Sequence, residues 1–295
     1  MPWLQLRLRT DKDKAESWSN ALEQCGAISV SLEDAGDEPL LACALEETPL
    51  WSQTWVTALF ESDAQADIVL TQLTHLLRLP SQPTCEIEIL ADQDWERAWM
   101  DRFQPIHFGG PLWVVPSWLA PPQPDAVNII LDPGLAFGTG THATTALCLS
   151  WLSQHPPVNQ YVIDVGCGSG ILAIATLKLG ARHALGVDVD PRALDVSREN
   201  AERNAVTARI TLGMPDALPD SPQADLVIAN ILAQPLIQLA PRLIRLVKPG
   251  GTLILSGMLE NQTAEVSQHY VNDVDLERQV HDQWAMLVGK RKPCG

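Results

Sequence analysis

Several features that would place a chain in a special class of protein are missing from this sequence. No apolar run approaches the roughly 20 residues that span a bilayer, and the opening residues MPWLQLRLRTDKDKAE alternate in polarity where a signal peptide has an apolar block. The cysteines form no Cys-x-x-Cys pair; they stand at positions 25, 43, 85, 148, 167 and 294. We therefore expect a cytoplasmic protein with reduced thiols and without a membrane segment, a disulfide framework or a metal site.

Basic residues are also scarce. The chain has 20 Lys and Arg against 36 Asp and Glu, which gives a formal net charge of −16. Residues 1–124 hold 7 basic and 19 acidic side chains, and residues 125–295 hold 13 and 17. Because a nucleic acid needs a basic footprint, we do not expect one as a direct partner. The acidic first part either serves solubility or attracts a basic partner.

The first ninety residues have the pattern of a β-α-β-β-α-β unit. Strands are expected at 3–8, 27–32, 55–60 and 85–90, and helices at 12–25 and 64–78, the first of them closed by Gly26. This order predicts a ferredoxin-like α+β domain over residues 1–90, a fold that by itself names no function. Residues 91–124 are expected to link it to the rest of the chain through a helix at 91–104 and a hairpin turning at Gly109 and Gly110.

Residues 125–295 alternate between strand and helix patterns. Strands are expected at 161–165, 184–188, 208–212, 225–229 and 252–256, helices at 170–180, 191–204, 234–246 and 260–270, and a closing strand pair near 275–281 and 283–289. Such alternation predicts an α/β domain with a mostly parallel sheet and helices on both faces. No coiled-coil pattern or apolar stripe suggests assembly, so we expect a monomer.

A glycine-rich turn follows the first strand of this second part. Val162 to Gly170 reads VIDVGCGSG, with glycines at 166, 168 and 170. A dinucleotide fingerprint has the spacing G-x-G-x-x-G and would need a third glycine where Ile171 stands, so a nicotinamide enzyme is the weakest candidate. We interpret the G-x-G-x-G spacing as a loop that binds S-adenosyl-L-methionine, with Gly166 and Gly168 among its contacts.

Two polar side chains follow other strands of the same sheet. Asp188 ends the second strand, 22 residues after Gly166, where a carboxylate can accept hydrogen bonds from ribose hydroxyls. Asp190 stands before Pro191 and is expected to cap the next helix. Asn230 leaves the fourth strand, within reach of a substrate amine or of the amino-acid part of the cofactor; the competing interpretation is a turn or helix cap.

The segment before the glycine loop is rich in glycine and threonine. Residues 131–145 read LDPGLAFGTGTHATT, a composition that can close over a ligand. His142 is more often a helix cap than a catalytic base in such a position, so no catalytic residue is assigned.

These pieces together resemble the ribosomal protein L11 methyltransferase family. The resemblance rests on LDPGLAFGTGTHATT, VIDVGCGSGILAIATLKLGA, GVDVDP and ANILAQPL, in that order, and it extends over the whole chain. It implies a class I, Rossmann-like methyltransferase domain over residues 125–295 and an N-terminal domain that recognises L11. It also implies transfer from S-adenosyl-L-methionine to lysine ε-amino and N-terminal α-amino groups, with cofactor contacts at Thr145, Gly166, Asp188 and Asn230. Many amino methyltransferases have Asn-Pro-Pro-Tyr after the fourth strand, whereas this chain keeps the amide in Asn-Ile-Leu-Ala.

Two other functions stay open on the sequence. A class I methyltransferase acting on another protein or a small molecule would share the glycine loop and Asp188, but it leaves the acidic first domain unexplained. A non-catalytic S-adenosyl-L-methionine-binding protein would share the loop as well.

Overall fold

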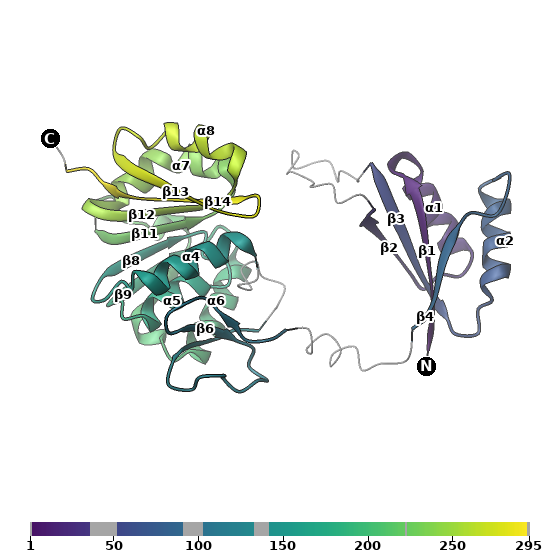
Figure 1. Cartoon of the computed structure of the whole chain (residues 1–295), viewed down its shortest axis with the longest axis horizontal. Helices are drawn as coiled ribbons and strands as arrows, with labels where there is room; N and C mark the ends of the chain where they lie inside the picture. Colours follow the sequence, from purple (N-terminus) through teal and green to yellow (C-terminus); the bar gives the residue numbers. More distant parts are fainter. Residues whose placement is uncertain (1, 36–51, 91–102, 133–141, 222, 294–295) are drawn as a thin grey trace. The chain divides into compact units, whose positions relative to one another are not determined.

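The computed structural model describes residues 2–35, 52–90, 103–132, 142–221 and 223–293 (Figure 1). The chain divides into two compact units, residues 1–101 and 102–295, and each has hydrophobic clusters of its own. The expected connecting helix at 91–104 falls almost wholly outside the described residues, as does most of the glycine- and threonine-rich segment at 131–145. Among the described residues, no helix combines the length and the apolar character that a membrane crossing requires.

The first unit is a four-stranded antiparallel sheet with two helices. Its elements are β1 (Trp3–Asp11), α1 (Lys12–Gln24), β2 (Ser29–Asp34), β3 (Gln53–Glu61), α2 (Ala66–Leu76) and β4 (Cys85–Leu90), and the strands lie in the order β2-β3-β1-β4. Leu4, Leu6 and Leu8 alternate along β1 and pack with Trp18 and Leu22 of α1 in one buried cluster. The expected ferredoxin-like order of elements is therefore confirmed.

The second unit begins with a small sheet that precedes the main one. It consists of β5 (Ile106–His107), β6 (Leu112–Val115) and β7 (Val127–Ile130). The expected hairpin forms between β5 and β6, where Gly109 and Gly110 both have positive φ, 85° and 47°. The hairpin is part of the second unit, since that unit starts at residue 102.

The main sheet of the second unit has seven strands. They are β8 (Tyr161–Val165), β9 (His183–Val187), β10 (Ile210–Gly213), β11 (Ala224–Asn230), β12 (Val247–Leu259), β13 (Val274–His281) and β14 (Trp284–Arg291), in the order β10-β9-β8-β11-β12-β14-β13. The first five are parallel, and β14 runs antiparallel to both β12 and β13. The closing strand pair is thus the reversed hairpin that the sequence suggested.

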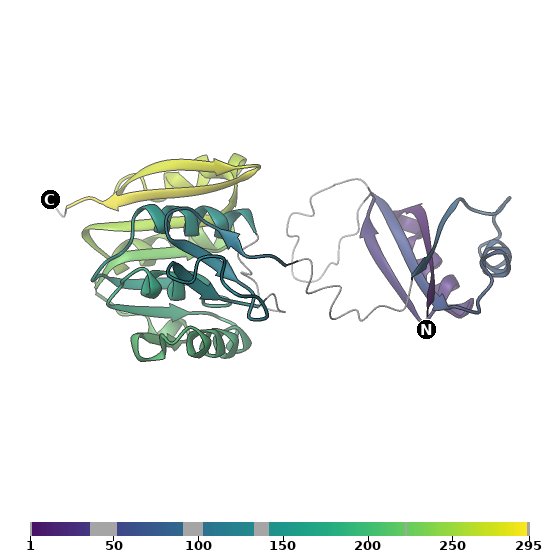
Figure 2. The ribbon, with the colours of Figure 1, turned by 60° about the horizontal axis from the view of Figure 1, so that its bottom comes forward.

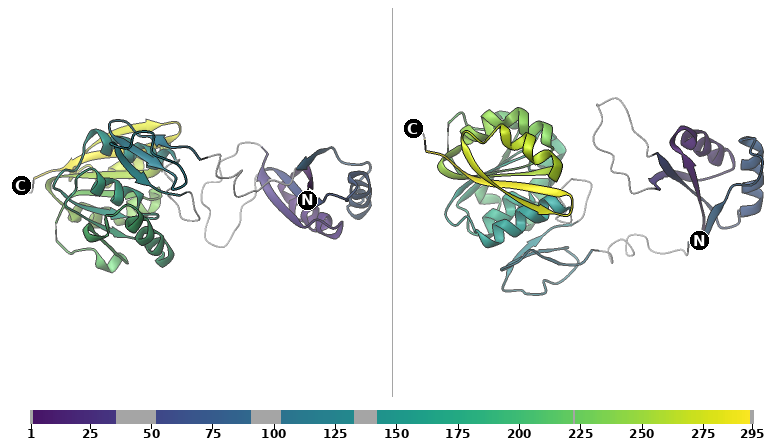
Figure 3. Two further views of the ribbon diagram at one scale, coloured as in Figure 1. Left: turned by 90° about the horizontal axis from the view of Figure 1, so that it is seen from below. Right: turned by 45° about the horizontal axis from the view of Figure 1, so that its top comes forward.

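Helices cover both faces of this sheet, as Figures 2 and 3 show. They are α4 (Ala143–Gln154), α5 (Ile171–Lys178), α6 (Pro191–Arg203), α7 (Ala233–Leu246) and α8 (Thr263–Gln268). Side chains of α4, α5 and α6 share one buried cluster with the sheet, and those of α7 and α8 share the other. The helix expected at 260–270 is a 3-10 turn at Glu260–Gln262 followed by α8. A Rossmann-like, mostly parallel α/β sheet with a smaller α+β unit before it confirms the predicted fold class.

Candidate active site

The strand order reverses between β8 and β11, and this places the candidate site. From β8 the chain runs outward to β9 and β10, then returns to β11 on the other side of β8. Such a switch point leaves a crevice beyond the carboxyl ends of the strands. Gly166 follows β8, Asp188 follows β9, and Asn230 ends β11. Thr145, the third residue of α4, joins them through a hydrogen bond to Asn230, so the structure brings the predicted residues to one edge of the sheet.

The glycine loop is held by backbone hydrogen bonds to the neighbouring strand. Gly166, Gly168 and Gly170 have φ of 74°, 54° and 78°, the left-handed region that side chains disfavour. The N–H groups of Gly166 and Cys167 both donate to the carbonyl of Val187, at 2.8 and 3.0 Å. The end of β9 therefore fixes the path of the loop that follows β8.

Two of the glycines are also required by contacts within the protein. A Cβ at position 166 would overlap Cγ2 of Ile231, and a Cβ at 170 would lie 2.9 Å from Oγ and 3.1 Å from Cβ of Ser197. From the sequence, these glycines are explained only by contact with a ligand. The structure adds that the loop lies directly against the end of β11 and against α6.

Asp188 is a backbone acceptor as well as a candidate ligand residue. Its Oδ2 accepts from the N–H of Gly168 at 2.9 Å, and its Oδ1 accepts from the N–H of Asp190 at 3.0 Å. Each carboxylate oxygen can accept a further hydrogen bond. Asp190 accepts from the N–H of Arg192 at 2.9 Å and precedes Pro191, which confirms it as the N-cap of α6.

Asn230 and Thr145 connect the end of β11 to the beginning of α4. Nδ2 of Asn230 donates to Oγ1 of Thr145 at 3.2 Å, and Thr145 is buried while Asn230 is partly exposed. Beside them the buried hydroxyl of Ser256, on β12, donates to the carbonyl of Thr144 at 3.2 Å. The first turn of α4 is thereby tied to two adjacent strands, and the Asn230 amide is held at the crevice.

Three buried polar residues of α6 were not identified from the sequence. Ser197 Oγ donates to the carbonyl of Gly168 at 2.8 Å, and Asn200 Nδ2 donates to that of Ser169 at 2.9 Å. Asn204, which caps the end of α6, bonds both the N–H and the carbonyl of Ile130 at 2.8 Å. Their spacing puts them on one face of the helix with buried Leu194 and Ala201. Polar residues on an otherwise apolar helix face were the available signal.

Asp164 lies beneath the glycine loop and is fully buried. Its Oδ2 accepts from the N–H of Ala173 at 3.0 Å, in the first turn of α5, whose N-cap is Gly170 and has no side chain. Among the described residues, its Oδ1 has no hydrogen-bond partner. Burial raises the pKa of Asp164 to about 7, the hydrogen bond from Ala173 opposes that shift, and the charge of Asp188 adds to it. The carboxyl group thus caps the N-terminus of α5 in place of a side chain at Gly170.

His142 has a structural position. It is the N-cap of α4, its Nδ1 lies 2.7 Å from Oγ1 of Thr144, and its ring meets Trp284 edge-on at 4.6 Å between ring centres. Desolvation lowers the pKa of this histidine. The expected helix cap is confirmed. Residues 133–141, which precede His142, lie outside the described residues.

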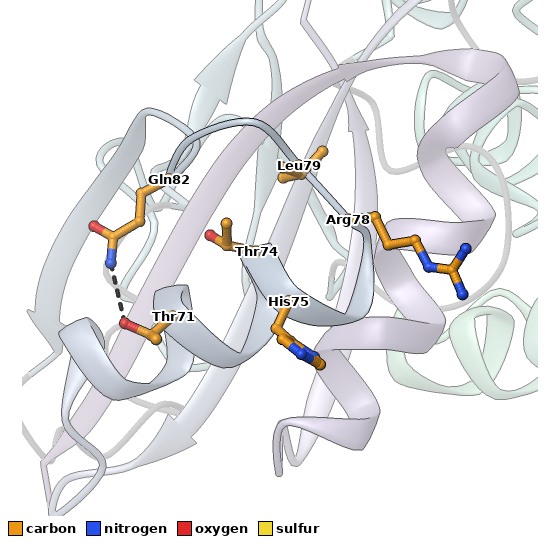
Figure 4. A pocket seen from close by; sticks show the side chains of 6 residues that line it. All are labelled: Thr71, Thr74, His75, Arg78, Leu79 and Gln82. Carbon is orange, nitrogen blue, oxygen red and sulfur yellow. Dashed lines mark hydrogen bonds between the residues drawn. The ribbon is translucent and has the colours of Figure 1, made fainter.

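A separate hollow lies in the first unit, at the end of α2 (Figure 4). It is lined by Thr71, Thr74, His75, Arg78, Leu79 and Gln82. Gln82 Nε2 donates to Oγ1 of Thr71 at 3.1 Å across one side of it. The residues that line this hollow belong to the first unit, whereas the predicted site residues belong to the second.

Comparison with known proteins identifies the family. The family model described as "Ribosomal protein L11 methyltransferase (PrmA)" matches residues 2–292. The chain belongs to this family. The ribosomal protein L11 methyltransferase of Shewanella woodyi is 50% identical over 293 residues, which are 99% of this chain and 100% of that protein. That of Pseudomonas putida is 51% identical over 294 residues, again 99% and 100% of the two chains.

A solved structure of the same family shares the fold. The ribosomal protein L11 methylase of Lactobacillus delbrueckii subsp. bulgaricus is 34% identical, with a TM-score of 0.59, over 65% of this chain and 100% of that one. The family resemblance suggested by the sequence is therefore confirmed, and the chain is an enzyme of a protein methyltransferase family.

Proposed function

We propose that this chain transfers methyl groups from S-adenosyl-L-methionine to the lysine ε-amino and N-terminal α-amino groups of ribosomal protein L11. The observation that carries the proposal is the family match over residues 2–292, together with relatives of that name matched along their full length. The grouping of Thr145, Gly166, Asp188 and Asn230 at one switch point supports the same reaction, because these side chains and backbone turns meet where an α/β sheet binds its ligand.

The residues at this edge fit S-adenosyl-L-methionine in polarity. The oxygens of Asp188 keep lone pairs for ribose hydroxyls after accepting from Gly168 and Asp190. Exposed apolar side chains follow three of the parallel strands at the same edge; they are Val189 after β9, Met214 after β10 and Leu232 after β11. An adenine ring needs such apolar surfaces together with a few polar groups. We assign the cofactor contacts to Thr145, Gly166, Gly168, Asp188 and Asn230.

The acceptor must be a neutral amine. A free lysine has a pKa near 10.4 and is protonated at neutral pH, so the site has either to favour the uncharged form by removing water from it or to accept its proton. When bound, the cofactor would supply an activated methyl group: the amine nitrogen bonds to the methyl carbon as the carbon–sulfur bond breaks, and the sulfur leaves as a neutral thioether. Asn230, fixed by Thr145, is placed to orient either the amine or the cofactor, and such alignment supplies much of the rate without a dedicated base.

The first unit is assigned to recognition of L11. Residues 1–101 hold 6 basic and 19 acidic side chains, a balance that attracts a basic ribosomal protein. With a ribosomal protein as substrate, the reaction takes place in the cytoplasm.

A labelled-methyl assay tests the function. The purified chain is incubated with labelled S-adenosyl-L-methionine and either purified L11 or total ribosomal protein, and the modified residues are mapped by mass spectrometry. We expect label on amino groups of L11. Label on other proteins or small molecules but not on L11 would favour a different substrate. Cofactor binding without any transfer would indicate a non-catalytic binding protein.

A further inference from the structure

Ile231, between Asn230 and the N-cap of α7, lies in an unusually confined position. Its backbone N–H donates to the carbonyl of Ser256 at 3.0 Å, which extends the pairing of β11 with β12 by one residue. Its side chain is partly buried and packs against the cluster on the α7 and α8 face of the sheet. Two glycines leave the space that it occupies: Gly166, directly after β8, and Gly257, within β12.

The first glycine accommodates the side chain. Cγ2 of Ile231 lies where a Cβ at Gly166 would have to be. Gly166 is itself fixed, since its N–H donates to Val187 at 2.8 Å. Ile231 branches at Cβ and has few χ1 rotamers, so this contact restricts the residue strongly.

The second glycine accommodates the backbone. Gly257, with φ of 92°, lies between Ser256 and Met258, where the register of β12 with β14 shifts. A Cβ at this position would overlap the carbonyl oxygen of Ile231 and lie 2.7 Å from its carbonyl carbon. The register shift in β12 therefore coincides with the place where the Ile231 carbonyl group approaches the strand.

These two contacts also restrict Asn230, the residue before Ile231. The amide of Asn230 is bonded at the other end to Thr145. Because the following residue is confined on two sides, shifts of the Asn230 backbone along the crevice are restricted. We propose that Ile231 is a positioning residue of the methyl transfer, which holds Asn230 in place through Gly166 and Gly257; this rests on the proposed function.

Two variants of Ile231, to Val and to Leu, distinguish a positioning role from a purely structural one, because the two roles predict opposite rankings of the variants. Ile231→Val keeps Cγ2, which contacts Gly166, and removes one methyl group. Ile231→Leu conserves the side-chain volume but is not branched at Cβ, so it lacks the Cγ2 methyl group that contacts Gly166. If Ile231 only fills the core, Leu is the better replacement, because swaps that conserve volume cost little stability. If it positions Asn230, Val is the better one.

The experiment measures kcat, KM for L11, and cofactor Kd in the full chain. We expect Ile231→Val to keep kcat within about threefold of the original chain, and Ile231→Leu to lower it at least tenfold, since misplacement by about 1 Å can cost roughly a hundredfold. KM and Kd should change less than kcat in both. Ile237, partly buried in the same cluster on α7, supplies the control pair Ile237→Val and Ile237→Leu, which should leave kcat unchanged.

The outcomes separate the two proposals. If the original chain does not methylate L11, the proposed function fails and this inference fails with it. If it does, and Ile231→Leu equals the original in kcat or exceeds Ile231→Val, the positioning role is wrong while the function stands. Thermal unfolding of all four variants identifies any loss that comes from instability, and a fall in kcat shared by Ile237→Leu would equally contradict the proposal.

Discussion

The two units of the chain differ in where polar side chains interact with the rest of the protein. In the first unit, Arg7 on β1 pairs at 3.3 Å with Glu33 on β2 and with Glu86 on β4, and its guanidinium lies 4.8 Å from the Trp55 ring centre. These groups are one third to three fifths exposed. In the second unit, buried side chains such as Asn200 and Asp164 bind backbone groups around the glycine loop.

This difference follows from what each backbone has to do. A regular sheet satisfies its own N–H and C=O groups, so its outward polar side chains are free to form surface pairs of small value. A tight loop at a strand end cannot pair all of its own N–H and C=O groups, so those that are buried must bond to other parts of the protein. The second unit therefore depends on particular residues near its site, whereas the first depends mainly on its alternating pattern.

The largest effect should come from removing residues 1–101. The remaining chain keeps both hydrophobic clusters of the second unit, so we expect it to fold and to bind S-adenosyl-L-methionine with an unchanged Kd. Methylation of L11 should fall by at least about a hundredfold, equivalent to some 3 kcal/mol of lost recognition. A short lysine peptide should be methylated equally by both chains. Full activity on L11 would show that recognition lies in the second unit.

Asp164→Asn should alter the pH dependence of stability. Its folded pKa, raised to about 7 by burial, exceeds the unfolded value of 3.8, so the folded state binds more protons between about pH 4 and 7. The free energy of unfolding therefore falls as pH rises through this window. Asn removes that slope, a change of up to a few kcal/mol, as measured by denaturant unfolding at several pH values. An unchanged slope would contradict the raised pKa of this buried carboxyl.

Asp225 gives the matched control for this experiment. Burial tends to raise the pKa of this carboxyl, but bonds from Lys248 at 2.6 Å and from the N–H of Tyr161 at 2.8 Å bring it below the usual value. Its contribution to stability is present above the unfolded pKa and is lost as pH falls through the folded one. The free energy of unfolding that depends on Asp225 therefore rises with pH, whereas the part that depends on Asp164 falls with pH. Asp225→Asn should reduce stability at neutral pH.

Asp188→Ala should weaken cofactor binding about 10- to 100-fold, because each hydrogen bond to a charged group contributes about 1.5–3 kcal/mol. Some of the loss would come from the Gly168 and Asp190 N–H groups that it leaves without an acceptor. Calorimetric titration with S-adenosyl-L-methionine measures the effect. Asp190→Ala, two residues away, should lower stability modestly as a lost N-cap and leave Kd nearly unchanged. Equal Kd values for both variants would refute the assignment of Asp188.

Arg7→Met should have the smallest effect. It removes two exposed ion pairs and a cation–ring contact but keeps an apolar stem over Trp55, so we expect less than about 1 kcal/mol of stability to be lost. Cofactor Kd should not change. Urea unfolding with and without salt measures this, and a loss of several kcal/mol would mean that the first unit also depends on specific polar contacts.

Local patterns were sufficient to predict most elements. The alternation of Leu4, Leu6 and Leu8, the Asp190-Pro191 helix start and the glycine spacing at 166–170 depend on residues close in sequence, and each is present as expected. One difference in the second unit is the segment 260–270, where a 3-10 turn precedes a short α8. There Gln262 accepts from the N–H of Leu259, which fixes a tight turn before the helix begins.

The order of strands and helices, the glycine loop and the polar residues after the strands could be predicted from the sequence, because they follow from periodicity and from residues within a few positions of one another. The groups that hold the site together are seen only once the chain is folded. Asn230 bonds Thr145 across 85 positions and Asn200 bonds Ser169 across 31, while Ile231 fills the space left by Gly166 and Gly257. Such contacts depend on how strands and helices pack, and no local pattern along the chain specifies them.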